Sequence, residues 1–189
     1  MNPRYGYLIE PLGSEYNNTK NIAGVDLVVN TTIEDAAFVN RIGVVVATPE
    51  NSDQIKEGDV VVVHHNVFRT YLDMKGEQRK SNEYFRDGLY LVSPERIFLY
   101  KTNEGDWKTT NEYCFVRPVD YIQDGEFLRA EEKEEHLGLL VYSNQKLFDL
   151  GLIEGDTVAF TKNSEYEFTI EGDKLYRMQT RDICLTLSE

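Results

Sequence analysis

The sequence predicts an all-β protein built from two tandem small β-barrels with long loops. Three observations lead to this prediction. Three apolar blocks occur twice in the same order, each copy has a Gly-Asp step before an apolar run, and aromatic residues make up 12% of the chain. Aromatic and β-branched residues favour strands, and a recurring block is the most informative feature for the architecture of a whole chain.

The repeated blocks are short apolar strands with recognisable ends. The first block of each copy stops at a proline, which cannot continue a central strand. The second block begins with a glycine, and the third closes the copy. The three pairs are Tyr7–Pro11 with Cys114–Pro118, Gly43–Val62 with Gly138–Phe160, and Leu89–Leu99 with Leu175–Leu185.

The Gly-Asp steps at Gly58-Asp59 and Gly155-Asp156 predict tight turns. Glycine supplies the backbone freedom for a sharp turn, and aspartate hydrogen-bonds the turn backbone. One such step is a weak signal, but two of them inside collinear blocks support a tandem repeat.

The blocks give a first barrel at residues 1–100, a polar connector at 101–111 and a second barrel at 112–189. The first barrel contains two long excursions, one between its first two blocks and one at Asn66–Gly88. Loops of this length in a compact domain are usually functional or disordered. Outside the charged run at 131–135, no segment shows the periodicity of a helix.

The composition excludes several classes of function. A net charge of −13 disfavours nucleic acid and anionic membrane surfaces as partners. No apolar run reaches the length of a membrane span, and the N-terminal residues show no apolar signal core. Two cysteines form no disulfide framework, so we expect a cytoplasmic protein.

No catalytic or metal-binding constellation is found, so we predict no enzyme activity, no cofactor and no metal. His64 and His65 are adjacent on an apparent strand, and neighbours on a strand face opposite sides. Cys114 and Cys184 lack the CxxC spacing of a zinc or redox site. Both cysteines lie in apolar strands, which favours small core residues.

The order of the blocks resembles the GroES-type co-chaperonins, the lids of chaperonin folding chambers. In that family a first strand and a mobile loop precede a Gly-led strand, an acidic Gly-Asp strand and a closing stretch. The stretches that stand in those places are Gly43–Ala47, Glu57–Val62 and Tyr90–Leu99 in copy one, and Gly138–Tyr142, Glu154–Phe160 and Tyr176–Leu185 in copy two. The match at Arg181-Asp182-Ile183 is especially close.

This resemblance implies two GroES-like barrels, in a co-chaperonin that caps a GroEL-type chaperonin and assists ATP-dependent folding. The mobile loop would be residues 16–40, and its chaperonin-binding residues would be Val25, Leu27, Val28 and Val29. The alternative interpretation of Val25–Val29 is a buried strand. The second copy has no clear mobile loop.

The resemblance also implies a ring, which we expect to contain seven chains. In the family the first strand of a subunit pairs with the last strand of its neighbour. The corresponding edge residues would be Tyr7, Leu8, Ile9, Ile183, Cys184 and Leu185, and Glu112–Arg117 would pair with Ile97–Tyr100 inside the chain. Unpaired edges invite strand addition from another chain.

Small barrels of this kind also occur in proteins with two other functions. One is a ring-forming structural or assembly protein, such as a virion component, that reuses the same barrel. The drift of the loops is compatible with a virus-encoded protein acting in the host cytoplasm. A small-barrel nucleic-acid binder is disfavoured by the net charge of −13.

Overall fold

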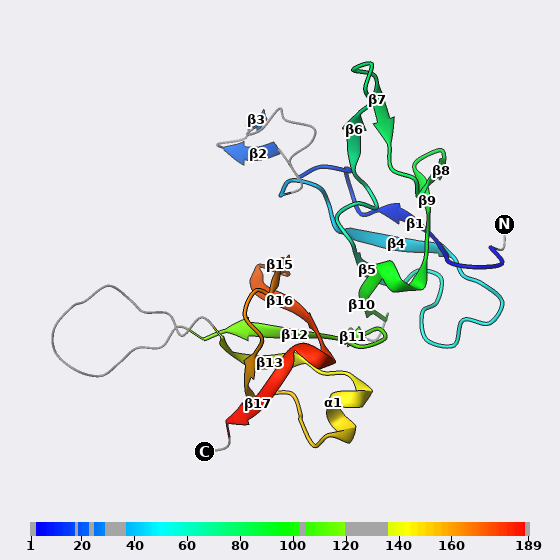
Figure 1. Ribbon diagram of the computed structural model, residues 1–189. Coiled ribbons are helices and arrows are strands. Elements are labelled where there is room, and N and C mark those ends of the chain that lie inside the picture. Colours follow the sequence, from blue (N-terminus) through cyan, green and yellow to red (C-terminus); the bar gives the residue numbers. More distant parts are fainter. Residues whose placement is uncertain are drawn as a thin grey trace, which may run out of the picture. The chain divides into compact units, whose positions relative to one another are not determined.

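The computed structural model describes residues 3–17, 19–22, 25–28, 37–102, 105–119 and 136–187. It divides into two compact units, Met1–Trp107 and Lys108–Glu189, which are described separately (Figure 1). Strands dominate both units, so the all-β prediction is confirmed.

Unit 1 is built on one large antiparallel sheet with two small hairpins. The sheet runs in the order β11-β10-β5-β4-β1-β9-β8, in which β11 begins at the last residue of unit 1 and continues into unit 2, and β2-β3 and β6-β7 form separate two-stranded sheets. A short 3-10 helix, η1, lies between β9 and β10. The bounds are β1 (Tyr7–Pro11), β2 (Thr19–Ile22), β3 (Val25–Val28), β4 (Ile42–Ala47), β5 (Val60–Val63), β6 (Thr70–Leu72), β7 (Gln78–Lys80), β8 (Tyr84–Arg86), β9 (Leu89–Val92), η1 (Pro94–Arg96), β10 (Ile97–Lys101) and β11 (Trp107–Thr109).

Unit 2 repeats the order of six of these strands. Its sheet runs β15-β16-β12-β13-β14-β17, which corresponds strand by strand to β8-β9-β1-β4-β5-β10 of unit 1. The 3-10 helix η2 precedes β17 as η1 precedes β10. The bounds are β12 (Tyr113–Pro118), β13 (Leu137–Tyr142), α1 (Gln145–Asp149), β14 (Thr157–Phe160), β15 (Tyr166–Ile170), β16 (Asp173–Gln179), η2 (Thr180–Asp182) and β17 (Ile183–Leu187).

The Gly-Asp turns have the same construction in both units. The glycine has φ +88° at Gly58 and φ +98° at Gly155, a conformation that residues with a Cβ rarely adopt. The aspartate after it accepts a hydrogen bond at 2.8 Å from the backbone N–H of Lys56 in unit 1 and of Ile153 in unit 2. Each turn thereby brings the β5 or β14 strand back beside the Gly-led strand.

Each unit buries its own apolar core. The core of unit 1 centres on Phe68 and Tyr90, whose rings meet edge to face at 4.9 Å between centroids. In unit 2, Phe115 packs in the same manner against Phe168 at 5.9 Å. Edge-to-face pairs of this kind add to the stabilisation from buried area.

Three expectations differ from the structure. Within the described residues neither large sheet closes on itself, so each is an open sheet and not a closed barrel. The strand β12 pairs with β13 and β16, not with Ile97–Tyr100. A helix, α1, follows β13 because Asn144 caps it by accepting a hydrogen bond from the backbone N–H of Leu147, a local signal too short to show a periodicity.

Candidate functional site

The excursion between β1 and β4, where the docking loop was predicted, is closed at its base. An isolated β-bridge joins Tyr16 to Val39, and the N–H of Asn40 donates to the carbonyl of Glu15 at 2.9 Å. The two ends of the excursion are therefore held side by side before the chain leaves the sheet.

Side chains fix both ends of this excursion. The Nδ2 of Asn40 donates at 2.9 Å to the carbonyls of Leu12 and Ser14, and Asn40 is 3% exposed. The hydroxyl of Tyr16 accepts a hydrogen bond from the N–H of Thr70 at 2.8 Å and donates to the carbonyl of Thr70 at 3.1 Å. Tyr16 and Asn40, the limits predicted for a mobile loop, are thus both hydrogen-bonded to neighbouring segments, and the mobility of the segment between them stays a prediction.

Three of the four predicted docking residues lie on a hairpin strand. Val25, Leu27 and Val28 belong to β3, which pairs with β2 in antiparallel register, Leu27 opposite Lys20. Val29 lies outside the described residues. The backbone of β3 is extended. An extended backbone is compatible with a docking segment and with a buried strand, so it does not distinguish these two interpretations.

The predicted edge role of the first strand is wrong for this fold. Tyr7, Leu8 and Ile9 lie on β1, which has β4 on one side and β9 on the other. All three side chains are buried, with Ile9 0% exposed. A strand that is apolar on both faces is stabilised inside a sheet and not at its margin.

The last strand does lie at the margin of its sheet. Within the described residues, Ile183, Cys184 and Leu185 on β17 have only β14 as a neighbouring strand, and Leu185 is 64% exposed. The corresponding strand of unit 1, β10, has a second neighbour in β11, and its residues Ile97–Tyr100 are buried. The two copies therefore differ in whether this edge is covered.

The two histidines do not face opposite sides. His64 and His65 follow the last residue of β5, and their rings stack with centroids 4.2 Å apart. The alternation of a strand no longer applies there, because the chain is already turning. Burial, followed by the positive charges of Arg41 and Arg69, lowers the pKa of His65.

The cysteines occupy different environments. Cys114 is buried in the core, and burial raises the pKa of its thiol to about 12, so the prediction of a core residue holds for it. Cys184 is exposed on β17, which contradicts that prediction. The strand β17 lies at the edge of its sheet, and the edge position depends on which other strands pair with it, which the residues around Cys184 do not show. The described residues include no group of His, Cys, Asp or Glu that could hold a metal ion.

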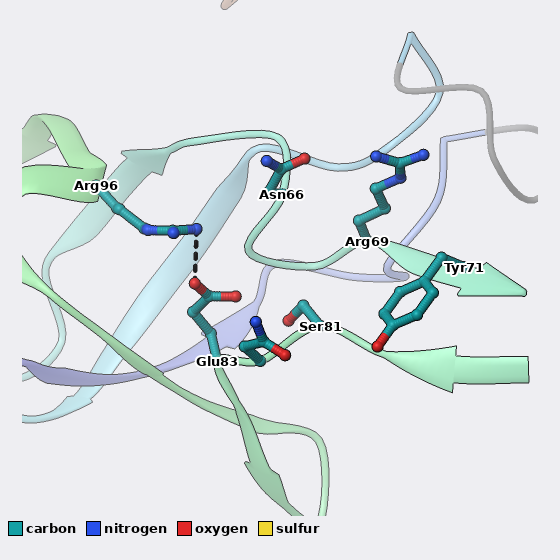
Figure 2. Close-up of a pocket in the computed structure, with 7 residues that line it drawn as sticks. Asn66, Arg69, Tyr71, Ser81, Glu83 and Arg96 are labelled. Atoms are coloured by element: carbon teal, nitrogen blue, oxygen red, sulfur yellow. Dashed lines mark ion pairs between the residues drawn. The ribbon is translucent and has the colours of Figure 1, made fainter. Parts of the chain in front are cut away.

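A polar pocket of about 220 Å³ lies in unit 1, around the second long excursion. Figure 2 shows Arg96 and Glu83 on one side of it and Arg69 and Tyr71 on the other. Arg96 Nη1 and Glu83 Oε1 form an ion pair at 2.6 Å. The lining residues are Asn66, Arg69, Tyr71, Ser81, Asn82, Glu83 and Arg96.

Three turns that are tied together form the walls of this pocket. The N–H of His64 donates to the carbonyl of Arg96 at 2.9 Å, which joins the end of β5 to η1. The hydroxyl of Ser81 donates to the carbonyl of Val67 at 2.5 Å, which joins the β7–β8 turn to the turn after β5. These two hydrogen bonds connect the three turns that carry most of the lining residues.

The described residues of unit 2 differ from unit 1 at the places that line this pocket. The hydrogen bond from His64 to Arg96 corresponds to one from Thr161 to Asp182 at 2.8 Å, so an acid stands where unit 1 has Arg96. The chain then passes from Thr161 to β15 without a hairpin equivalent to β6–β7. In the sequence, only the length of the excursion at Asn66–Gly88 pointed to a feature special to unit 1. Length alone did not identify the residues that line the pocket.

No helix in the described part of the chain is long and apolar enough to cross a membrane. Comparison with known proteins finds no matching family model and no matching curated protein.

Proposed function

We propose that this protein is a co-chaperonin that binds a GroEL-type chaperonin through the excursion between β1 and β4 and has no enzyme activity. The observation that carries the proposal is the placement of that excursion. It lies between the first strand and the Gly-led strand, is closed at its base by the Tyr16–Val39 bridge, and contains the β2–β3 hairpin with its Val-Asp-Leu-Val strand.

This arrangement suits weak, repeated docking. A short apolar segment offers little area, so a single contact is weak. Several copies of the segment on one assembly would bind together with high avidity. The two GroES-like units would form the body of a cap, and the expected assembly is a ring of seven chains in the cytoplasm.

The first experiment mixes the purified full chain with a GroEL-type chaperonin, with and without ATP, and images the mixture by negative-stain electron microscopy. We expect additional density on the ends of the chaperonin cylinder in the presence of ATP. Unchanged cylinders at a large excess of the chain, together with no co-sedimentation, would contradict the proposal.

A ring-forming structural or virion-assembly protein is the second candidate, and it needs only the self-association that the edge position of β17 among the described strands allows. The strand Ile183–Leu187 contains no charged residue and no proline, the two devices that usually block strand addition. Such a protein would form the same type of ring without binding chaperonin, so the mixing experiment separates the two functions.

Both candidates predict that β17 mediates self-association. Replacement of Leu185 by Lys is expected to convert the assembly to monomers, because a charge on an edge strand opposes pairing with another chain. Light scattering at micromolar concentration measures the mass. The matched control is Leu12→Lys, which places the same charge at an exposed leucine of unit 1 outside β17. A monomeric wild-type chain, or an assembly that persists in the Leu185 variant, would argue against this role.

A further inference from the structure

The polar pocket contains an arginine with no counter-ion in the described part of the chain. No ion pair or hydrogen bond joins Arg69 to another described residue, whereas Arg96 in the same pocket is paired with Glu83. A guanidinium stays protonated in proteins, and a partly buried charge without a partner is unfavourable. Within the described residues, Arg69 thus has a guanidinium that is available to an anion.

An unused acceptor stands in the same pocket. The Oδ1 of Asn66 and the Nε of Arg69 are both shielded from solvent and have no hydrogen-bond partner among the described residues. Figure 2 shows Asn66 beside Arg69 on the pocket wall. Buried polar groups are normally hydrogen-bonded. A ligand that both side chains turn to contact would accept a hydrogen bond from Arg69 and donate one to the Oδ1 of Asn66.

The local charge favours an anion in spite of the acidic chain. The lining carries two arginines and one glutamate, a balance of +1 within a protein of net charge −13. Burial and the positive charges of Arg41 and Arg69 lower the pKa of the neighbouring His65, which is consistent with a positive potential at this place. The partly buried Glu83 opposes a ligand of high negative charge, so a monoanion fits better than a phosphate dianion.

The size restricts the ligand further. A volume of about 220 Å³ is below the range of roughly 300–1,000 Å³ typical of pockets for whole cofactors or drug-sized molecules. It suits one end or one side chain of a peptide. A peptide carboxylate carries an anionic acceptor close to a backbone N–H donor, which is the complement of Arg69 and Asn66.

We propose that this pocket is a binding site for a peptide carboxylate, in which Arg69 receives the carboxylate and the Oδ1 of Asn66 accepts the adjacent backbone N–H. The carboxylate comes either from a chain terminus or from an acidic side chain. The site belongs to unit 1, because unit 2 lacks the hairpin β6–β7 and has Asp182 in place of Arg96. It is independent of chaperonin docking, which uses the excursion between β1 and β4.

The test is a titration of the full chain, followed by calorimetry, with three short peptides of the same length. The first has a free C-terminus and no acidic side chain, the second is its amidated form, and the third is amidated with one internal glutamate. We expect the first or the third to bind and the neutral amidated peptide not to bind. The comparison of the first with the third identifies the source of the carboxylate. Equal binding of all three peptides, or binding of none, would overturn the proposal.

The variant Arg69→Gln is expected to weaken the binding of the carboxylate peptide by about tenfold or more, because a charge-assisted hydrogen bond is lost. Asn66→Asp should weaken it as well, since it places a negative charge next to the ligand. The control is Arg86→Gln, an equal loss of charge in the same unit at an exposed residue outside the pocket. Binding that is unchanged by Arg69→Gln, in a variant whose thermal unfolding matches wild type, would contradict the role of Arg69.

Discussion

A variant in which Leu27, Val28 and Val29 are all replaced by serine is expected to lose chaperonin binding and to keep its fold. The driving force for docking through an apolar segment is the area that leaves water, at roughly 25 cal/mol per Å². Serine removes nearly all of that area. Because a ring binds through several loops together, a small loss per loop is multiplied over the assembly. Binding is measured by co-sedimentation with chaperonin and ATP, and folding by thermal unfolding.

The matched control removes apolar side chains from the other hairpin of unit 1. Leu72 and Met74, at the β6–β7 hairpin, are 47% and 106% exposed, and their replacement by serine should leave chaperonin binding intact. A different result would follow if Val25–Val29 packs as a buried strand. The triple variant would then unfold at a much lower temperature, since truncation of each large core side chain costs roughly 2–5 kcal/mol.

Local patterns were sufficient for the parts of the fold that depend on local chemistry. The prolines after the first blocks, the Gly-Asp steps and the apolar runs are properties of a few consecutive residues, and the strands and turns lie where these residues indicated them. Asp59 and Asp156 accept the same hydrogen bond in their two turns because the same short sequence meets the same backbone geometry.

Pairing between distant segments was not predictable in the same way. Whether β1 or β17 lies at an edge depends on which other strands lie beside it, and an apolar strand has the same pattern in both positions. Cys184 is exposed for this reason, although its sequence neighbours match those of a core strand. The pocket is a further example, because its walls come from three turns that are separated along the chain.

The candidate docking segment was predicted from the family resemblance and stays a prediction, whereas the contacts at its two ends are features of the fold. Tyr16 and Asn40 are hydrogen-bonded to Thr70 and to Leu12 and Ser14, contacts that no local pattern indicates. These hydrogen bonds hold the two ends of the excursion beside the sheet. Those to Thr70 also connect the excursion to β6, since Thr70 is the first residue of that strand.

The largest losses of stability are expected at the two glycines that lead the second blocks. A Cβ on Gly43 would lie 2.5 Å from Cγ2 of Ile9 and 2.7 Å from the carbonyl oxygen of Glu10. A Cβ on Gly138 would meet Cγ1 of Val116 and lie 2.7 Å from the carbonyl oxygen of Arg117. Neither backbone oxygen can move without disturbing the pairing of β1 with β4 or of β12 with β13.

Gly43→Ala and Gly138→Ala are therefore each expected to reduce the free energy of unfolding by roughly 1–3 kcal/mol, as in other cases where a packed site receives an extra methyl group. Urea unfolding measures the size of the loss. Hydrogen–deuterium exchange localises it, and exchange should increase in unit 1 for the first variant and in unit 2 for the second. Val46→Ala is the control, because this β4 side chain is 39% exposed and its loss should cost less than about 0.5 kcal/mol. A glycine variant that is as stable as wild type would contradict the close approach of the paired strands at that glycine.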